Sequence, residues 1–490
     1  MTMPFRPSMK ILSEAFVQKI INEAFQLLER VGVFVENREA ERLLLDAGAM
    51  KDSATSRLRI PARIIQDALA SAPHTITMVD ASGEQSYCVG GDEIHFDPGS
   101  AALRIFDHQT QSERKASTHD LIRFSRLIQQ LEHFHFQSTG LISSDVPEQI
   151  SDCYRLYLAL QHCSKPIVTG LFVVEGFEPM RDMLSAVRGG ADQLREKPLA
   201  IFDACPSPPL KWSNLTSQSV LDCARSGIPS EIVSMPLTGA TAPITLAGAL
   251  VQLAAENLAG VAMAQLADKS APVIFGGSPA AFDLRTANAP MGAMETMMID
   301  SAYSQIGKAL GLPTHAYLGL SDSKCVDAQA GLETGMGMVM AALSGINVIS
   351  GGGMIDYEMT QSLEKLVIDN EICGMAYRLI EGIAQRDEPI ALDLFPAGEK
   401  EFDFLTNPHT LEWFHVEQKY PRIIDRGTHE EWERDGKPTL AERASQQVQK
   451  LLEKDSGPIL NNEVRTRVSH VMKSHANRFG LEELPQETVS

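Results

Sequence analysis

The sequence has no excess of positive charge. Its 490 residues include 43 Lys and Arg against 63 Asp and Glu, which gives a net charge of −20. Nucleic-acid-binding proteins need a basic surface, so this balance argues against a nucleic-acid partner. It is compatible with a cationic small molecule, although this is a weak indication because soluble proteins are often acidic.

Cysteine is scarce, and its spacing does not suggest a disulfide framework. The seven cysteines are an odd number and form no CxxC pair, which predicts reduced thiols. The first ten residues, MTMPFRPSMK, lack the apolar core of a signal peptide. We expect no apolar run close to the ~20 residues of a membrane helix. A soluble, cytoplasmic protein without a membrane partner is therefore predicted.

Signatures of several enzyme classes are also missing. The sequence contains no GxGxxG after a strand-like run, no P-loop and no GxSxG, which argues against Rossmann dehydrogenases, NTPases, kinases and serine hydrolases. His133 and His135 can point to one side of a strand, but a third metal ligand has no convincing position. His315 and Cys325 bracket another strand and are no more persuasive. No metal site is predicted.

From about residue 131, short apolar runs alternate with longer helical patterns. This alternation indicates βαβ units and a parallel sheet, and near-continuous apolar runs are typical of strands buried on both faces. Eight units in roughly 260 residues favour a TIM (β/α)8 barrel over an open sheet. The eight runs span residues 133–140, 166–173, 199–204, 231–237, 271–277, 314–320, 345–352 and 389–395.

Three regions follow from this pattern, within the one to three domains that the length allows. Residues 1–130 form an N-terminal α/β or helical preamble to the barrel. Residues 131–400 form the TIM barrel catalytic domain. Residues 401–490, which are charged and helical in pattern, form a C-terminal helical extension that packs on the barrel or on a neighbouring subunit.

Active sites of TIM barrels lie at the C-terminal ends of the strands. The most polar strand end is SDSKCVDAQAGLETG at 321–335, and we predict Asp322, Asp327, Gln329 and Glu333 as catalytic residues. For each one alone, a hydrogen-bonded loop side chain or a helix cap is about as good an interpretation, because Asp favours turns and N-caps. The whole cluster at one strand end favours function.

A glycine triplet, Gly351–Gly353, ends the seventh strand-like run. Glycine permits close backbone approach and positive φ, and backbone amides at the start of a helix can hold a carboxylate. A tight turn between strand and helix is at least as good an interpretation.

Several longer segments form a recognisable series: IPARIIQDALASAP (60–73), PLTGATAPITLAG (236–248), APVIFGGSPAAFDLRT (271–286), SDSKCVDAQAGLE (321–333) and the stretch from NPHTLEWF to PTLAERA (407–444). In this order they resemble the trimethylamine methyltransferase superfamily over essentially the whole chain. The resemblance implies a TIM barrel that moves a methyl group from a methylated amine to the Co(I) corrinoid (cobalamin) of a separate small protein. It therefore implies a corrinoid-protein partner and no tightly bound cofactor.

The archetype of this superfamily demethylates trimethylamine and carries pyrrolysine. The present chain contains only the twenty standard residues and resembles the non-pyrrolysine branch, whose characterised members act on quaternary amines such as glycine betaine, proline betaine or carnitine. A quaternary ammonium leaves as a neutral amine, so its methyl group mainly needs positioning in line with the attacking cobalt. A free tertiary amine would need activation.

A site for such a cation combines aromatic faces, worth ~0.5–2 kcal/mol each, with carboxylates. Each aromatic assignment competes with ordinary packing, since a barrel core buries Phe anyway. A betaine carboxylate also needs hydrogen-bond donors. The predicted substrate-binding residues are Phe172, Phe202, Asp203, Phe275, Tyr317, Lys324, Ser350, Gly351, Gly352, Gly353 and Tyr357.

Two other functions stay open. The first is a TIM-barrel hydrolase or lyase that uses Asp322, Asp327 and Glu333 in acid–base chemistry. The second is a non-catalytic betaine-binding barrel. Ser350 stands where some betaine-demethylating relatives are expected to have histidine, which leaves the identity of the amine open. A homo-oligomer is also predicted.

Overall fold

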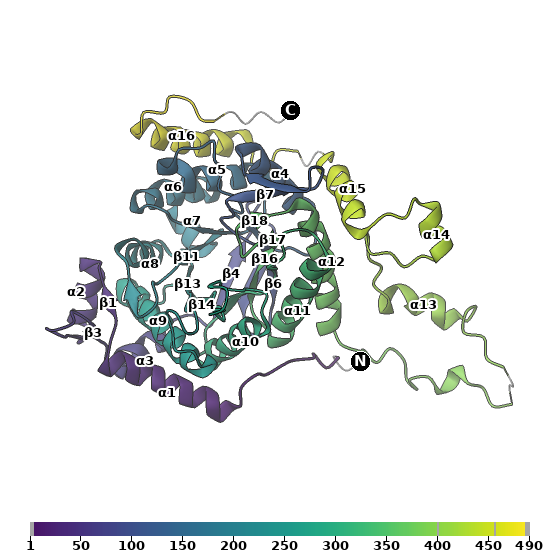
Figure 1. The fold of residues 1–490 in the computed structure, drawn as a ribbon, viewed down its shortest axis with the longest axis horizontal. Coiled ribbons are helices and arrows are strands. Elements are labelled where there is room, and N and C mark those ends of the chain that lie inside the picture. The colour runs from purple at the N-terminus through teal and green to yellow at the C-terminus, as the bar shows by residue number, and fades with distance from the viewer. Residues whose placement is uncertain (1–3, 399–400, 455–456, 486–490) are drawn as a thin grey trace.

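The computed structural model describes residues 4–398, 401–454 and 457–485. Parallel strands occupy its centre and helices surround them (Figure 1). The strands belong to two parallel sheets, one in the order β14-β13-β11-β10-β9 and one in the order β15-β16-β6. Single parallel bridges, Phe96 to Phe134 and Phe275 to Thr314, connect the two pairs of sheet edges. The strands are β6 (His95–Pro98), β9 (Gln137–Ser138), β10 (Ile167–Gly170), β11 (Ala200–Ala204), β13 (Ser230–Ser234), β14 (Val273–Gly277), β15 (His315–Tyr317) and β16 (Val348–Gly352).

Each of these strands is followed along the chain by a helix, after short inserted strands in the case of β6, β11 and β16. The α/β organisation predicted from the sequence is therefore confirmed. The helices are α4 (Thr118–Gln130), α5 (Ser151–His162), α6 (Phe177–Arg188), α7 (Ala191–Glu196), α8 (Asn214–Ser226), α9 (Leu246–Ala267), α10 (Met294–Ala309), α11 (Ala328–Ser344) and α12 (Leu363–Ile380).

Local sequence signals fix where these helices begin and end. The side chains of Ser213, Thr245 and Ser362 accept backbone N–H groups at the starts of α8, α9 and α12, as N-cap residues do. Gly227 and Gly345 end α8 and α11 with φ of 68° and 65°, a conformation that glycine adopts without a Cβ penalty.

Helix α9 corrects one expectation. Its 22 residues are long and apolar enough to cross a membrane by length and composition, with 78% of the window buried inside the protein. The expectation that no apolar run reaches such a length was therefore wrong. The helix is a core element: Gly260 lies so close to Trp212 that an added Cβ would stand 2.6 Å from the indole ring.

Seven of the eight expected strand runs contain a strand of the parallel sheets. The eighth, 389–395, was wrong: it holds only a 3-10 turn, η3 (Leu392–Leu394), and Ile390 and Leu392 are exposed. The remaining parallel strand is β6, which pairs with β16 and comes from the region predicted as the preamble. The predicted domain boundary at residue 130 stays a prediction. It would place β6 in a different domain from its partner strand β16. Residue 400, at the other predicted boundary, lies outside the described residues.

Smaller elements precede and interrupt the parallel strands. The N-terminal helices pack against α9 and its neighbours (Figure 1). These elements are α1 (Glu14–Arg30), β1 (Phe34–Val35), α2 (Arg38–Asp46), β2 (Met50–Lys51), β3 (Leu58–Arg59), α3 (Ala62–Ser71), β4 (Thr75–Val79), β5 (Ser86–Gly90), β7 (Arg104–Asp107), β8 (Ser112–Lys115), η1 (Glu148–Ile150), η2 (Val174–Gly176), β12 (Lys211–Trp212), β17 (Met354–Ile355) and β18 (Thr360–Gln361).

The C-terminal part contributes the helices α13 (Pro408–Glu417), α14 (His429–Arg434), α15 (Leu440–Leu452) and α16 (Asn462–Arg478). Helix α15 packs on α4 and α12, and α16 packs on α5 and α6. By contrast, α13, α14 and the described residues between α12 and α13 stand away from the body of the protein (Figure 1).

Candidate functional site

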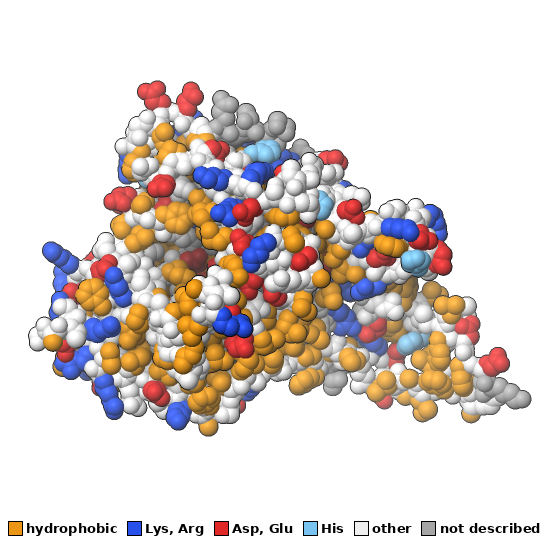
Figure 2. Space-filling model, viewed as in Figure 1, with side chains coloured by type: hydrophobic (Ala, Val, Ile, Leu, Met, Phe, Trp, Pro, Cys, Tyr) orange, Lys and Arg blue, Asp and Glu red, His pale blue; other side chains and the backbone are white. Residues whose placement is uncertain are grey.

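A cavity of about 300 Å³ lies at the C-terminal ends of the parallel strands. Its walls include Asp203 of β11, Tyr317 of β15 and Phe172, which follows β10. Helix α5 contributes Arg155, and the turn between β17 and β18 contributes Glu358. In the space-filling view the surface is hollowed near β11 and β13, with acidic atoms deep in the hollow (Figure 2).

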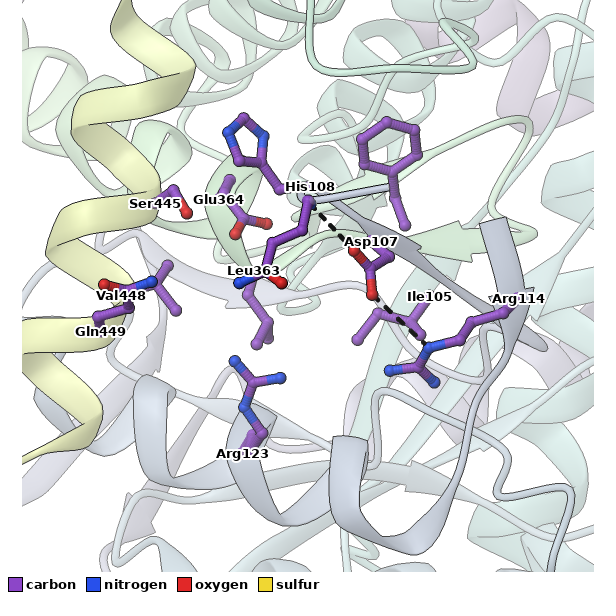
Figure 3. A pocket seen from close by; sticks show the side chains of 12 residues that line it. Ile105, Asp107, His108, Arg114, Arg123, Leu363, Glu364, Ser445, Val448 and Gln449 are labelled. Atoms are coloured by element: carbon purple, nitrogen blue, oxygen red, sulfur yellow. Dashed lines mark hydrogen bonds and ion pairs between the residues drawn. The ribbon is translucent and has the colours of Figure 1, made fainter. Parts of the chain in front are cut away.

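A second cavity, of about 150 Å³, is lined by residues of the β7–β8 hairpin, α4, α12 and α15 (Figure 3). The Asp107 carboxylate there accepts the backbone N–H of Gln109 at 2.9 Å and lies 4.0 Å from Nε of Arg114. These contacts give the Asp107 carboxylate a structural role in the β7–β8 hairpin. The cavity at the strand ends is the better candidate site, because parallel α/β folds bind ligands there.

Arg155 is the most unusual group in the wall of the strand-end cavity. The side chain is buried, and its Nη2 donates to Oγ1 of Thr139 at 3.0 Å. Nε and Nη1 are also buried and have no hydrogen-bond partner among the described residues. The guanidinium carbon lies 4.5 Å from the centre of the Phe172 ring. Burial lowers the pKa of Arg155 to about 10, so the group remains a cation at neutral pH.

Two carboxyl groups face the same cavity. Asp203 pairs in register with Glu231 of β13, and burial followed by the charge of Glu231 raises the pKa of Asp203 well above its usual range. Burial raises the pKa of Glu358 to about 7, with a further contribution from nearby Asp322. Oδ1 of Asp203 and Oε1 of Glu358 have no hydrogen-bond partner within the described part of the chain.

The backbone that carries Glu358 is strained. Asp356, Tyr357 and Glu358 have φ values of 54°, 54° and 68°, three successive left-handed conformations without a glycine. Such a conformation costs roughly 1–2 kcal/mol per residue and concentrates at functional sites. This turn is where the chain bends Glu358 towards the cavity.

A chain of buried polar side chains lies beneath the cavity. Oγ of Ser350 donates to Oδ1 of Asp97 at 2.6 Å, and Nε2 of His315 lies 2.9 Å from the same hydroxyl. Nδ1 of His315 lies 2.7 Å from Oε1 of Glu231, a close but poorly aligned contact. The His315 ring also lies edge-on to the Tyr317 ring, with centroids 5.0 Å apart.

Burial shifts the pKa values of the titratable groups in this chain. Burial raises the pKa of Asp97 and of Glu231 well above the usual range and lowers that of His315 to about 4. The imidazole is therefore neutral. The raised pKa values favour the neutral acid form of both buried carboxyls, and the Glu231 carboxyl has no hydrogen-bond partner among the described residues.

Three of the predicted substrate-binding residues line the cavity: Phe172, Asp203 and Tyr317. The Tyr317 hydroxyl lies 3.0 Å from that of Ser100, another wall residue. Ser350 lies beneath them, in register with Tyr317 across β15 and β16. The structure therefore brings these four predicted residues to one place.

The predicted catalytic cluster lies beside the cavity and holds loops together. Both carboxylate oxygens of Asp322 accept backbone N–H groups, from Met291 and Gly292, at 2.9 Å. Glu333 accepts the Ser321 hydroxyl at 2.6 Å and the backbone N–H of Asp322 at 2.8 Å.

The other two members of this cluster have similar contacts. Asp327 is the N-cap of α11 and accepts the backbone N–H of Ala330 at 3.0 Å. The amide of Gln329 donates to Glu333 at 2.9 Å. Capping and loop contacts, the alternative recognised from the sequence, thus account for the hydrogen bonds of all four residues.

Other predicted residues have different surroundings. Lys324 lies over the Tyr357 ring at 4.0 Å and donates to the carbonyl of Asp322 at 2.6 Å. Phe202 and Phe275 are fully buried core residues.

The glycine triplet makes close backbone contacts. Gly351 and Gly353 have φ of 115° and 81°, and a Cβ on Gly352 would meet the Phe134 ring at 2.5 Å. The amide of Gly353 donates to Asp369 at 2.7 Å. Close packing and positive φ give these glycines a structural role.

Sequence reasoning missed Arg155, Glu358, Asp97, Glu231 and His315 as site residues. Arg155 belongs to a helix in which eleven of twelve residues are buried, so an amphipathic pattern could not indicate its direction. His95 and Asp97 alternate with Phe96 in a strand that was not expected at all. A signal was available for Glu231 and His315, because each is a polar residue within an apolar strand run, EIVSMPL and THAYLGL respectively.

The rings of His133 and His135, which were considered as metal ligands, both lie against the Tyr377 ring, with centroids 6.1 and 5.1 Å from it. Nδ1 of His135 lies 2.9 Å from Nδ1 of His95, whereas His133 borders another cavity beside Glu132. The described residues contain no group of three or more His, Cys, Asp or Glu side chains that could hold a metal ion.

Comparison with known proteins establishes the family. The profile of the family described as Trimethylamine methyltransferase (MTTB) matches residues 3–480. This chain belongs to that family, and it is a methyltransferase. The trimethylamine methyltransferase MttB of Desulfitobacterium hafniense is 28% identical over 96% of this chain and 94% of its own length. The glycine betaine methyltransferase of D. hafniense strain Y51 is 29% identical over 97% and 99%.

A solved structure shares the fold. The monomethylamine methyltransferase MtmB of Methanosarcina barkeri matches with a TM-score of 0.50 and 11% sequence identity, over 94% of this chain and 86% of that one. At this identity the similarity concerns the fold alone.

Proposed function

We propose that this methyltransferase takes a methyl group from a quaternary amine, such as a betaine or carnitine, and delivers it to the Co(I) corrinoid of a separate protein in the cytoplasm. The observation that carries the proposal is a cavity at the strand ends of a family member, lined by carboxyl groups and aromatic faces suited to a cation. One of its relatives is named a glycine betaine methyltransferase.

The two parallel sheets are proposed to form one closed (β/α)8 barrel. The bridges at Phe96–Phe134 and Phe275–Thr314 support closure because they join both pairs of edges. Such a barrel surrounds the cavity with strand ends and leaves one route of access, from the face on which βα loops lie. The corrinoid protein is proposed to dock on that face, so that its cobalt can approach the methyl group.

The charges in the cavity suit a reaction in which the substrate loses its positive charge. As the methyl group leaves, the amine nitrogen becomes neutral, so a fixed anion beside it would favour the substrate over the transition state. Burial raises the pKa of Glu358 to about 7, so this group is poised between its neutral and ionised forms, and burial with the charge of Glu231 raises the pKa of Asp203 well above its usual range. Aromatic faces such as Phe172 and Tyr317 add attraction without a full charge.

The main contribution of the chain is then positioning. The enzyme is proposed to hold the ammonium group so that one methyl points out of the cavity towards the cobalt. Orienting the two reactants in this way can lower the activation free energy by several kcal/mol. Phe172, Asp203, Tyr317 and Ser350 remain the proposed substrate-binding residues from the sequence, and Glu358 joins them.

A homo-oligomer is also proposed. The segment that stands away from the body exposes apolar side chains, with Ile383, Ile390, Leu392, Leu405 and Leu411 between 69% and 89% exposed. Exposed apolar patches mark interaction surfaces. Light scattering on the purified protein tests this, and a monomer at micromolar concentration would reject it.

The hydrolase or lyase alternative receives less support. It requires Asp322, Asp327 and Glu333 to have free carboxylates, yet each accepts hydrogen bonds from loops or a helix end. The alternative of a non-catalytic betaine-binding barrel predicts the same amine binding as the proposal but no methyl transfer.

The decisive experiment is methyl transfer to free cob(I)alamin. A panel of glycine betaine, proline betaine, carnitine, choline and trimethylamine is incubated with the protein, and methylcobalamin formation is followed by absorbance. Methylation that depends on a quaternary amine and on the protein is expected. Binding of these amines without methylcobalamin would support the non-catalytic alternative, and turnover of trimethylamine alone would reject the quaternary-amine assignment.

A further inference from the structure

The cavity contains a buried arginine with unused donors. Nε and Nη1 of Arg155 belong to a wall residue of the cavity, and neither has a hydrogen-bond partner among the residues that the structure describes. Burying such groups is costly unless a partner is present. The nearest ring, Phe172, covers one face of the guanidinium but leaves the edge with its N–H groups free, because a ring face accepts no in-plane hydrogen bond.

The rest of the molecule does not supply this partner. No carboxylate oxygen in the described ranges lies within ion-pair distance of Arg155, although Asp152 and Asp203 are near enough to raise its pKa against the effect of burial. Asp203 and Glu358 each keep one buried oxygen unpartnered. The cavity therefore presents unsatisfied polar groups of both signs.

We propose that Arg155 binds the carboxylate of the substrate and makes that carboxylate a requirement for tight binding. The planar fork of Arg155 matches a carboxylate in a bidentate pair, while Asp203, Glu358 and the Tyr317 ring face the ammonium group. A zwitterion satisfies both sets of groups at once. A simple cation such as choline leaves the guanidinium unpaired.

This inference rests on the proposed function for its substrate, a trimethylammonium carboxylate, and adds the residue that selects it. Lys324, Ser350 and Gly351–Gly353 were the donors expected from the sequence for the carboxylate. Lys324 instead donates to a carbonyl, Ser350 to Asp97, and the Gly353 amide to Asp369. Nε and Nη1 of Arg155 are buried in the cavity wall and have no partner among the described residues.

Equilibrium binding to the purified protein, without cobalamin, tests the proposal. The probes are glycine betaine, 3-(trimethylammonio)propanoate, 4-(trimethylammonio)butanoate, choline and 3,3-dimethylbutanoate. The last is glycine betaine with carbon in place of nitrogen, so it has the carboxylate without the cation. At least one of the three zwitterions is expected to bind roughly 10- to 100-fold more tightly than choline, as loss of a charge-assisted hydrogen-bonded pair implies.

Variants at Arg155 locate the effect. R155L is expected to bring the affinity of the best zwitterion to within about threefold of that of choline, because only the shared cation is then recognised. R155K keeps the charge but loses the fork, and should retain an intermediate preference. The control is R188K: Arg188 donates to the backbone carbonyls of Lys197, Asp80 and Val79, away from the cavity, and its replacement should leave the preference unchanged.

The outcomes are distinct. If choline binds to the wild-type protein as tightly as every zwitterion, the proposal fails, even where R155L does not fold. If R155K and R155L keep the full preference, it also fails. Preferential binding of zwitterions without methyl transfer to cob(I)alamin upholds this inference and rejects the proposed function. Methyl transfer from choline or trimethylamine as efficient as from zwitterions upholds methyl transfer and rejects the role of Arg155.

Discussion

Replacing Glu358 with glutamine isolates one titrating group of the cavity. Burial raises the pKa of Glu358 to about 7 from an ordinary value of 4.5, so the folded protein holds this proton more tightly than the unfolded chain does. The stabilisation associated with the proton is complete below about pH 4.5. It is lost as the pH rises from about 4.5 through about 7, because in this range the unfolded chain releases its proton while the folded protein still holds it. The amide introduced by E358Q has a similar shape and stays neutral at every pH.

The size of the effect follows from the difference in pKa. A difference of about 2.5 units corresponds to about 3 kcal/mol at 1.36 kcal/mol per unit, and this is an upper value because Glu358 is partly exposed. E358Q should therefore have nearly the stability of the wild type at pH 5. At pH 8.5 it should be more stable by up to about 3 kcal/mol.

Urea unfolding at pH 5 and 8.5, followed by Trp fluorescence, measures this difference. Trp212 is fully buried against α9 and reports on the core. The matched control is D283N: the side chain of Arg285 holds the pKa of Asp283 below its usual range, so Asp283 is ionised at both pH values. An E358Q stability difference that is equal at the two pH values would refute the reasoning.

The same group should control cation binding. A cation favours ionised Glu358, so the affinity of the wild type for tetramethylammonium should increase as the pH rises through about 7. The Ser278 hydroxyl donates to Glu358. The titratable groups close enough to interact with its charge are Asp322, Asp300, Cys205 and Tyr317. E358Q should lose most of this pH dependence, and calorimetric titration at pH 6, 7 and 8 measures it.

Three further changes test the rest of the structure. S350A removes the hydroxyl between Asp97 and His315 and should lower the free energy of unfolding by about 2–6 kcal/mol. The control S125A removes a buried hydroxyl with no partner in the described ranges and should leave that free energy nearly unchanged. Urea unfolding measures both. D322N should slow methyl transfer by less than about tenfold, because acid–base groups contribute 10²–10⁴-fold; a larger loss with substrate binding intact would revive the hydrolase or lyase chemistry. G260A puts a Cβ against an indole ring and should cost about 1–3 kcal/mol, while G331A in α11 meets nothing within 4 Å and should gain up to about 1 kcal/mol.

The fold was largely predictable from the sequence because seven strands lie in short runs, most of them largely apolar, that alternate with helical patterns. The missing strand, β6, reads HFDP. Two of its residues, His95 and Asp97, are polar but buried, so the apolar pattern that identifies a buried strand is absent. The error at 389–395 has the opposite cause: that run is apolar, but the strand that pairs with the free edge of β16 is β6.

The site was less predictable, because residues from distant parts of the chain meet in it. Asp203 and Tyr317 end strands, so the rule for strand ends found them. Arg155 arrives from a helix, and Glu358 from a turn with positive φ at residues that usually avoid it. No local pattern indicates which way such side chains point.

The buried polar chain from Asp97 to Glu231 is best explained by the cavity above it. A protein core gains more stability from apolar side chains than from carboxyls that lack full hydrogen bonding, so stability alone gives no reason for these residues. Burial raises the pKa values of the carboxyls Asp97, Asp203 and Glu231, and the charge of Glu231 raises those of Asp97 and Asp203 further. A cation placed in the cavity offsets this repulsion and favours ionisation of the carboxyls near it. The interior is thus costly on its own and complementary to an ammonium group, which is the property that a methyltransferase for charged amines requires.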